Sequence, residues 1–281
     1  MNGFESWWQH LPEKMHPEIF RIGSFGIHYY GLMYILAFIS AYILSSIRMK
    51  EKRYSSLKLN SEILQGYFIA LIIGLIIGAR FGYVLFYNFS YYIHRPLEII
   101  LPFSFEGGFH FTGIAGMSYH GGLIGAITGA YIFTRKHKLD FWEMSDILMP
   151  GLPLGYTFGR IGNFINGELY GRVTDSPVGM YFPYAPGNEL RHPSQLYEAF
   201  FEGIVLFLFM WFIRKKITLK GAMLPVYMIG YGVIRFFIEF FRQPDEQLGF
   251  VFLSFSMGQI LCFLMIFSGT LMLVWLSKRK E

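Results

Sequence analysis

The stretch GRIGNFINGELYG, residues 159–171, ends a strongly apolar segment and carries two charged side chains, Arg160 and Glu168. Charged groups at membrane depth are unfavourable, so they normally pair with one another or line a polar cavity. Asn163 and Asn166 add amide donors, and the four glycines let backbone N–H groups approach a ligand closely. A run of this kind is suited to holding an anionic head group at the edge of a bilayer.

The composition of the whole chain supports a membrane setting for this run. Of the 281 residues, 53% are hydrophobic, 20% are aromatic and only 15% are charged, and the mean hydropathy is +0.39. These values are far from those of a soluble globular protein. A single cysteine excludes an intrachain disulfide and a cysteine-rich metal site. The net charge of +5 comes from basic residues between apolar segments, which we interpret as orientation signals and not as a nucleic-acid surface.

Seven apolar segments approach the roughly 20 residues that a membrane-spanning helix needs. They are residues 27–47, 63–88, 120–134, 144–164, 197–213, 222–241 and 257–276. The third and fifth are short, so they are either tilted, extended at their ends or partly re-entrant. We therefore expect an all-α polytopic integral membrane protein with about seven transmembrane helices, folded as one domain over residues 1–281.

The basic residues predict how these helices are oriented. Fifteen of the 24 Lys and Arg residues follow the first, third, fifth and seventh segments, which places them on one side of the membrane. The positive-inside rule makes that side cytoplasmic. The N-terminus is then outside, the C-terminus is cytoplasmic, and the connections at about residues 89–119 and 165–196 face outward.

Three glycine ladders predict close helix packing. Glycines recur every fourth residue in the second, third and fourth segments, at positions 74/78/82, 121/125/129 and 151/155/159. Small residues at this spacing give a helix a smooth face on which a neighbouring helix packs closely in lipid. We expect the second, third and fourth spans to form a compact centre.

Two groups of polar residues within apolar surroundings are candidates for chemistry. His120 stands between Tyr119 and two glycines at the outer entrance of the third span, where a helix cap or an interfacial hydrogen bond is the alternative explanation. Tyr231, Arg235 and Glu239 recur every four residues, which places them on one face of the sixth span. A buried Arg–Glu pair contributes little net stability, so a functional role competes with a structural one.

Other polar residues have structural explanations that compete with functional ones. Arg80, within a glycine ladder, is either a structural charge or a further phosphate contact. Arg242 is expected to snorkel to the interface from the outer end of its span. The remaining polar groups are given structural roles: charges at a helix N-terminus for Glu143 and Asp146, capping for Ser194 and Glu198, and packing for Cys262.

The arginines and amides indicate a class of ligand. Guanidinium groups bind phosphate with two parallel hydrogen bonds, so Arg160 and Arg235 with nearby amide donors suit a phosphate ester. In a cavity open to the bilayer, that ligand would be a phospholipid. A membrane transporter with an Arg–Glu lined pathway is the alternative, although it does not explain why the polar motifs gather near one face. A CDP-alcohol phosphotransferase would need several aspartates on one helix, and a rhomboid-like protease would need a serine in a Gly-x-Ser-Gly setting.

Six motifs give the chain a resemblance to the prolipoprotein diacylglyceryl transferase family. The resemblance runs over nearly the whole sequence, and the run at 159–171 is its most specific part. The motifs are HYYGLMY at 28–34, GARFGYVLFYN at 78–88, SYHGGL at 118–123, GRIGNFINGELYG at 159–171, RHPSQLYE at 191–198 and the segment 231–245. The chain departs from the family just before His120, where Ile114, Ala115 and Gly116 replace a polar residue and two glycines.

The resemblance implies a reaction and a place for it. A family member moves the diacylglyceryl group of phosphatidylglycerol to the lipobox cysteine of a preprolipoprotein signal peptide, forms a thioether and releases glycerol phosphate. It works in the bacterial inner membrane, with its site toward the outer face and without a cofactor or metal. The important positions of the family correspond here to Tyr30, His120, Arg160, Asn163, Glu168, Gly171, Tyr231, Arg235 and Glu239.

The residue types suggest a division of roles in such a reaction. Arg160 and Arg235 would neutralise charge on the phosphate ester, which makes it a better leaving group. His120 would take the proton of the substrate thiol, because imidazole exchanges protons near neutral pH. The other matched positions, with Arg80, would bind substrate.

Overall fold

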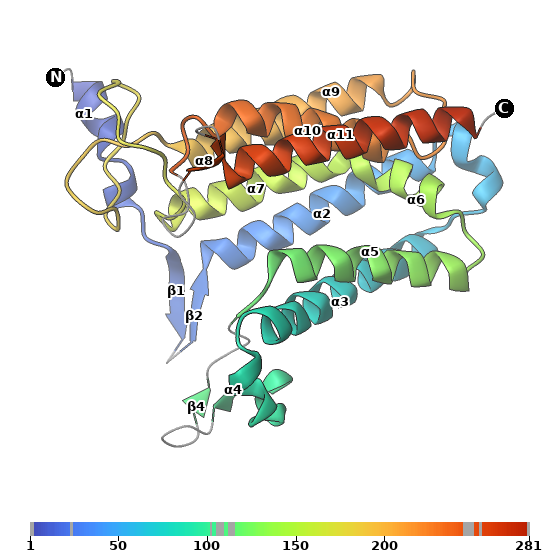
Figure 1. Cartoon of the computed structure of the whole chain (residues 1–281), viewed down its shortest axis with the longest axis horizontal. Helices are drawn as coiled ribbons and strands as arrows, with labels where there is room; N and C mark the ends of the chain where they lie inside the picture. The colour runs from blue at the N-terminus through green and yellow to red at the C-terminus, as the bar shows by residue number, and fades with distance from the viewer. Residues whose placement is uncertain are drawn as a thin grey trace. The chain divides into compact units, whose positions relative to one another are not determined.

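The computed structural model describes residues 3–22, 25–101, 103–104, 110–111, 116–243, 250–252 and 255–279. The chain divides into two compact units, one made of Met1–Arg48 with Ser145–Glu281 and the other of Met49–Met144. Most of the described residues are helical (Figure 1), and their strands form three two-stranded antiparallel hairpins. The expectation of a mainly helical protein is confirmed for the residues described.

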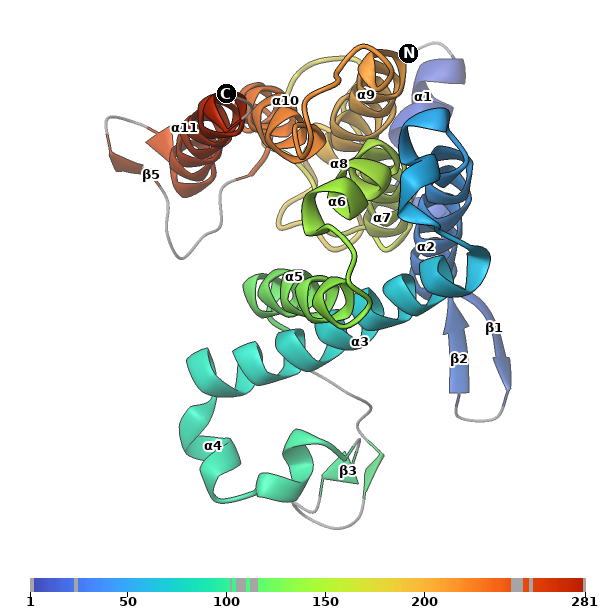
Figure 2. The ribbon, with the colours of Figure 1, turned by 90° about the vertical axis from the view of Figure 1, so that its right-hand side faces the viewer.

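The first unit holds the helices that surround the 159–171 run. Its N-terminal part comprises α1 (Gly3–Gln9), η1 (Pro12–Lys14), β1 (Glu18–Ile22), β2 (Phe25–His28) and α2 (Tyr29–Met49). After α6 (Phe141–Leu148), which leads in from the second unit, come η4 (Met149–Gly151), α7 (Leu152–Ile165), α8 (Ser194–Tyr197), η5 (Glu198–Val205), α9 (Leu206–Ile213), α10 (Met223–Ile238), β5 (Phe250–Phe252), β6 (Phe255–Ser256) and α11 (Met257–Lys278). Helices α10 and α11 pack side by side in both views of the ribbon (Figures 1 and 2).

The second unit is built on one tight helix pair. It comprises η2 (Lys52–Leu57), α3 (Ser61–Phe86), α4 (Phe89–Ile93), η3 (Pro96–Ile99), β3 (Phe103–Ser104), β4 (His110–Phe111) and α5 (Tyr119–Lys136). Two glycine ladders face each other between α3 and α5: a Cβ on Gly78 would lie 2.7 Å from the Cα of Gly125, and one on Gly82 would lie 2.8 Å from the Cα of Gly121. The close packing predicted for these two ladders is confirmed.

The third glycine ladder packs against the first span. A Cβ on Gly151 would meet Leu44 of α2 at 3.0 Å, and one on Gly155 would meet the carbonyl oxygen of Ala37 at 3.2 Å. The sequence predicted the second and third spans as its neighbours, and it did not predict this contact with α2. The expected fourth span is also not one continuous helix, because Pro150 lies where α6 gives way to the short helix η4 before α7 begins.

A π-helix interrupts the fifth span. Helices α8, η5 and α9 follow one another without a break from Ser194 to Ile213, and the eight residues of η5 have π geometry. The Thr157 hydroxyl on α7 lies 3.3 Å from the Ala199 carbonyl oxygen of the π-helix and donates to it. Gly203 lets the two backbones approach, because a Cβ there would lie 3.1 Å from the Cα of Thr157. π-helical turns are frequent at functional sites, and this one carries two buried glutamates, Glu198 and Glu202.

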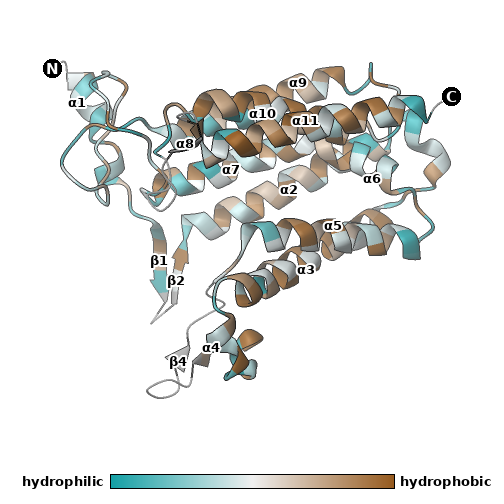
Figure 3. Cartoon of the chain, in the orientation of Figure 1, coloured by the Kyte–Doolittle hydropathy of each residue, from teal (hydrophilic) through white to brown (hydrophobic). Residues whose placement is uncertain are grey.

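The apolar surfaces of the helices are those of a protein in lipid. Four helices of the described part are long and apolar enough to cross a membrane: Tyr29–Met49, Ser61–Phe86, Ser194–Ile213 and Met257–Lys278, while Met223–Ile238 is a shorter apolar helix. On α2, Ile35, Ile39, Ile43 and Ile47 are about half exposed and recur every fourth residue. Figure 3 shows the same apolar character along the helices. An exposed apolar stripe of this length is typical of contact with acyl chains.

Candidate active site

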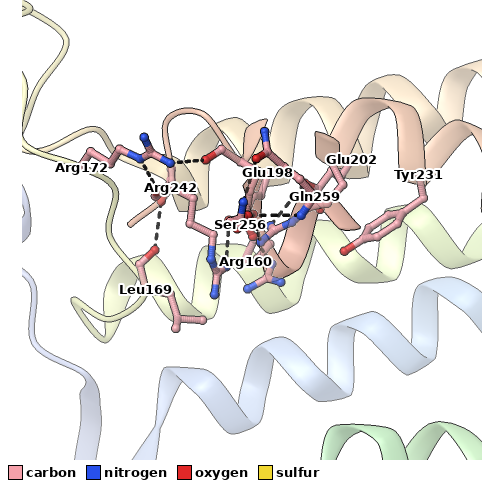
Figure 4. Close-up of polar contacts among 12 residues, drawn as sticks. Arg160, Leu169, Arg172, Glu198, Glu202, Tyr231, Arg242, Ser256 and Gln259 are labelled. Atoms are coloured by element: carbon pink, nitrogen blue, oxygen red, sulfur yellow. Dashed lines mark hydrogen bonds and ion pairs between the residues drawn. The ribbon is translucent and has the colours of Figure 1, made fainter. Parts of the chain in front are cut away.

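Three arginine side chains converge on one buried carboxylate in the first unit. Glu198, in the π-helix, has no exposed surface. Its Oε2 lies 2.7 Å from Arg160 Nε, and its Oε1 lies 3.0 Å from Arg235 Nη1 and 3.2 Å from Arg242 Nη1. Arg160 comes from α7, Arg235 from α10, and Arg242 from the residues that follow α10. Figure 4 shows Arg160, Arg242 and Glu198 gathered at this point.

Two further glutamates complete the charge balance of this cluster. Arg235 Nη2 lies 2.8 Å from Glu239 Oε2, and Arg235 Nη1 lies 3.5 Å from Glu202 Oε1. The Arg235–Glu239 pair predicted from the spacing is therefore confirmed as a contact. The Ser256 hydroxyl, at the start of α11, donates to Glu239 Oε1 over 3.0 Å. Three guanidinium groups thus face three carboxylates, and the buried cluster carries no net charge when all six groups are ionised.

Arg242 points inward, contrary to the expectation that it snorkels to the interface. Its backbone forms an antiparallel bridge with Gly171, and its carbonyl oxygen accepts a hydrogen bond of 2.8 Å from Arg172 Nε. These contacts fix the chain just beyond α10, so that the Arg242 side chain turns toward Glu198. A buried carboxylate attracts a guanidinium more strongly than interfacial water does when the geometry allows hydrogen bonds.

The asparagine and glutamate of the 159–171 run extend the cluster toward the end of α7. Arg160 Nη1 donates to Asn163 Oδ1 over 3.2 Å, and Asn163 Nδ2 donates to Glu168 Oε1 over 2.8 Å. Asn163 is buried and Glu168 is exposed, so this chain of contacts leads from the buried arginines to the surface. Tyr30 of α2 lies beside the same run, because its ring is 3.0 Å from the position that a Cβ on Gly162 would take.

One edge of Arg160 remains available for a ligand. Its Nε contacts Tyr156 and Glu198, and its Nη1 contacts Asn163. Among the residues that the structure describes, Nη2 has no hydrogen-bond partner, and the side chain keeps 17% of its surface exposed. Two N–H groups on one nitrogen are therefore free to bind an oxygen of an anion.

Gly171 has a clear structural reason to be glycine. Its N–H donates to the His192 carbonyl oxygen over 2.8 Å, and a Cβ at this position would lie 2.7 Å from that oxygen and would also clash with the Phe241 carbonyl. Gly171 thus allows the loop after α7 to lie against the end of α10. This contact supports the backbone at Arg242. It explains why residue 171 is glycine without any contact between Gly171 and substrate.

Two further candidates, His120 and Arg80, belong to the second unit. His120 is exposed in the first turn of α5, whose N-cap is Ser118, and no described residue hydrogen-bonds its ring. Arg80 is buried and donates to the backbone carbonyls of Ile99 and Glu98 over 2.8 and 2.5 Å, with its guanidinium over the ring of Tyr92. These contacts favour the structural explanation of Arg80 over a phosphate contact.

The altered segment before His120 is only partly described. Ile114 and Ala115 lie outside the described residues. Gly116 has a φ of +80°, and its carbonyl oxygen accepts a further hydrogen bond of 3.3 Å from Arg80 Nη1.

Sequence patterns did not predict Tyr156 or Glu202 as site residues, and they favoured a capping role for Glu198. Tyr156, on α7, donates to Glu202 Oε2 over 2.5 Å and packs its ring at right angles to that of Tyr231. The sequence did contain a signal for the two glutamates, because Glu198 and Glu202 are charged residues four positions apart inside an apolar span. Ionisable residues within a membrane span are candidates for function, and this holds for Glu198 and Glu202 as it does for Arg235 and Glu239.

Comparison with known proteins identifies the family. The family model described as prolipoprotein diacylglyceryl transferase matches residues 17–275. Relatives named phosphatidylglycerol–prolipoprotein diacylglyceryl transferase include those of Chlorobaculum tepidum, 55% identical over 100% of this chain and 96% of the relative, and Treponema denticola, 41% identical over 96% and 95%. The relative of that name from Helicobacter pylori is 41% identical over 98% and 97%. The chain belongs to the prolipoprotein diacylglyceryl transferase family.

Proposed function

We propose that this protein transfers the diacylglyceryl group of phosphatidylglycerol to the lipobox cysteine of preprolipoproteins, the first step of lipoprotein maturation. The family assignment supports this activity, and so do the names of relatives that match the chain over nearly its full length. The observation that carries the chemistry is the set of three guanidinium groups around Glu198 in a buried, apolar surrounding. The relatives give no support to the alternative of a transporter.

The reaction exchanges one bond to carbon for another. The cysteine sulfur attacks the glyceryl carbon that bears the phosphate ester, a C–S bond forms, and the C–O bond to the phosphate breaks. The electron pair of that bond leaves with glycerol phosphate, and the thiol proton passes to a base. Negative charge therefore grows on the departing phosphate oxygen, and groups that stabilise this oxygen accelerate the step.

The buried cluster is organised for that task before substrate arrives. Glu198 holds Arg160, Arg235 and Arg242 within 3.2 Å of its oxygens, so their mutual repulsion is compensated and their positions are fixed. Donors that are already in place stabilise a transition state without reorganisation at the moment of reaction. We assign the free Nη2 of Arg160 to a phosphate oxygen of the lipid, with Arg235 supplying positive charge beside it.

The other family positions are assigned to substrate binding around these arginines. Tyr30, Asn163 and Glu168 line the route from Arg160 to the exposed end of α7, where a polar head group enters. Glu239, just after α10, pairs with Arg235, and Tyr231, one turn before Arg235 on α10, packs its ring against that of Tyr156. No metal or cofactor takes part in this scheme.

His120 is the proposed base for the thiol. Replacing it with Asn or Gln is expected to slow the chemical step by roughly 100-fold, a typical effect of losing a general base. The acidic limb of the pH–rate profile should disappear or shift, because an amide side chain cannot accept the thiol proton. Single-turnover rates with phosphatidylglycerol and a lipobox peptide measure this directly. A near-normal rate with the wild-type pH dependence in His120→Asn would remove the base assignment.

The orientation proposed for the chain follows from its basic residues, and it places the site toward the outer face of the bacterial inner membrane. A reporter fused to the C-terminus is expected to be cytoplasmic, and a tag in the 165–196 loop should react with impermeant reagents from outside. Reporter activity measures on which side the C-terminus lies, and labelling of intact cells measures on which side the 165–196 loop lies. A C-terminus outside would contradict the arrangement of seven spans.

One assay tests the proposed activity itself. Purified protein, phosphatidylglycerol vesicles and a synthetic lipobox peptide should yield a peptide whose mass increases by the diacylglyceryl group through a thioether. A peptide with Ser in place of the lipobox Cys should give no product, because the nucleophile is absent. Absence of the thioether with the Cys peptide and folded protein would refute the proposal.

A further inference from the structure

The position of the Arg160 guanidinium depends on a chain of two hydrogen bonds behind it. Arg160 Nε donates to the Tyr156 hydroxyl oxygen over 2.7 Å, and the Tyr156 hydroxyl donates to Glu202 Oε2 over 2.5 Å. We propose that Tyr156 and Glu202 are positioning residues that aim the free Nη2 edge of Arg160 at the phosphate of the lipid. This inference rests on the proposed function, because it assigns a task to residues around the same site.

The direction of these hydrogen bonds is fixed by chemistry. Arg160 Nε–H can only donate, so the Tyr156 oxygen accepts from it and must send its own proton elsewhere. Three acceptors are within reach: Glu202 Oε2 at 2.5 Å, Glu198 Oε2 at 3.3 Å and the Tyr231 hydroxyl oxygen at 3.5 Å. The shortest contact takes the proton, and the lone pairs of the phenol oxygen then face Arg160. Glu202 therefore acts on Arg160 through Tyr156.

Three contacts together define the plane of the Arg160 guanidinium. Its Nε is held between the Tyr156 oxygen and Glu198 Oε2, both at 2.7 Å, and its Nη1 is held by Asn163 at 3.2 Å. The guanidinium carbon also lies 4.7 Å above the centre of the Tyr156 ring. A planar group fixed at two nitrogens and on one face has a single direction left for its third nitrogen, Nη2.

The surroundings of Glu202 favour this role over an ion pair with Arg235. Glu202 is fully buried, and its Oε1 lies 3.5 Å from Arg235 Nη1 without a hydrogen bond. Arg235 has closer carboxylates in Glu198 at 3.0 Å and Glu239 at 2.8 Å. The hydrogen bond from Tyr156 is thus the strongest contact of the Glu202 carboxylate.

The test separates the phenol oxygen from the aromatic ring. Tyr156→Phe keeps the ring under the guanidinium and removes only the oxygen, and Glu202→Leu keeps much of the volume but removes the acceptor. We expect Tyr156→Phe to lower kcat about 10-fold with little change in KM for phosphatidylglycerol, because the alignment matters most as charge develops. Glu202→Gln, whose amide oxygen still accepts the phenol proton, should retain more activity than Glu202→Leu.

A double-mutant cycle decides whether the two residues form one chain. If Glu202 acts through Tyr156, the double variant Tyr156→Phe/Glu202→Leu should be no slower than Glu202→Leu alone. The inference would be overturned if the fold losses of kcat in the two single variants multiplied in the double variant. A wild-type kcat in a folded Tyr156→Phe protein would also overturn it. Tyr67→Phe is the matched control, because it removes a buried phenol oxygen from α3 in the second unit and should behave as wild type.

The same experiment distinguishes a failure of the positioning roles of Tyr156 and Glu202 from a failure of the proposed transferase activity. Thermal melting of each purified variant in detergent verifies that it is folded, which is expected for the Phe variants because they retain the ring. Thioether formation by wild type and Tyr67→Phe supports the proposed function whatever Tyr156→Phe does. Absence of product with wild type would refute the proposed function, and the positioning roles that rest on it would fall as well.

Discussion

Arg160→Ala should abolish diacylglyceryl transfer while the protein stays folded. The variant loses the guanidinium edge that we assign to the phosphate, and loss of a single preorganised donor slows comparable reactions by roughly 100- to 1000-fold. Glu198 keeps two guanidinium partners, Arg235 and Arg242, at 3.0 and 3.2 Å, so this carboxylate stays paired. The cluster then carries one negative charge in excess, so we expect a lower melting temperature but a folded protein. Arg160→Lys keeps the charge without the planar fork and should fall between Ala and Arg in rate.

Arg235→Ala is expected to lose transfer and to lose more stability than Arg160→Ala. Arg235 faces three carboxylates, and Glu239 would lose its guanidinium partner at 2.8 Å. Removal of one partner from a buried ion pair destabilises proteins by about 3–5 kcal/mol. The sequence predicts that both arginines bind the phosphate, and the contacts in the structure give Arg235 a structural role as well.

Transfer rates and melting temperatures of the purified variants measure these expectations. Arg279→Ala is the matched control, because this arginine follows α11 and stacks on the Trp275 ring near the end of the chain. It should change neither quantity. Measurable transfer near the wild-type rate in Arg160→Ala would contradict the assignment of its free edge to the phosphate.

Local patterns in the sequence predicted the parts of the site that depend on one helix. The spacing of Tyr231, Arg235 and Glu239 fixed their common face, because residues four apart on a helix are neighbours whatever surrounds them. Hydropathy likewise located the helices α2, α3 and α11, since a long apolar run has few other structures in a membrane. These predictions needed no knowledge of tertiary contacts.

Such local patterns do not predict which helices contact one another. Every small-residue ladder offers the same smooth face, so the sequence could not tell that Gly151 and Gly155 pack against α2. Asp146 shows the same limit: it was assigned to its own helix N-terminus, yet its carboxylate accepts from the backbone N–H groups of Gly221 and Met223 at the start of α10. Helix α10 has Ala222 at its N-cap, which cannot cap it, and a distant carboxylate supplies the missing acceptor.

A large loss of stability is also expected for Glu198→Gln. The substitution keeps the size of the side chain and removes the one negative charge that Arg160, Arg235 and Arg242 share. The buried cluster would then carry a net positive charge, and loss of a partner from such a network lowers the free energy of unfolding by about 3–5 kcal/mol. Glu168→Gln is the control, because Glu168 is exposed and the amide oxygen still accepts from Asn163.

A second variant shows whether charge balance is the cause of that loss. Glu198→Gln/Arg242→Gln removes one positive and one negative charge together, so the remaining arginines and glutamates again balance. The double variant should therefore unfold at a higher temperature than Glu198→Gln, even though it contains one more substitution. Melting in detergent measures the order of the two. If the double variant were the less stable, the arginines would depend on the hydrogen-bond geometry of Glu198 and not on its charge. In that case the central carboxylate would serve to aim the three guanidinium groups, with little part in neutralising them.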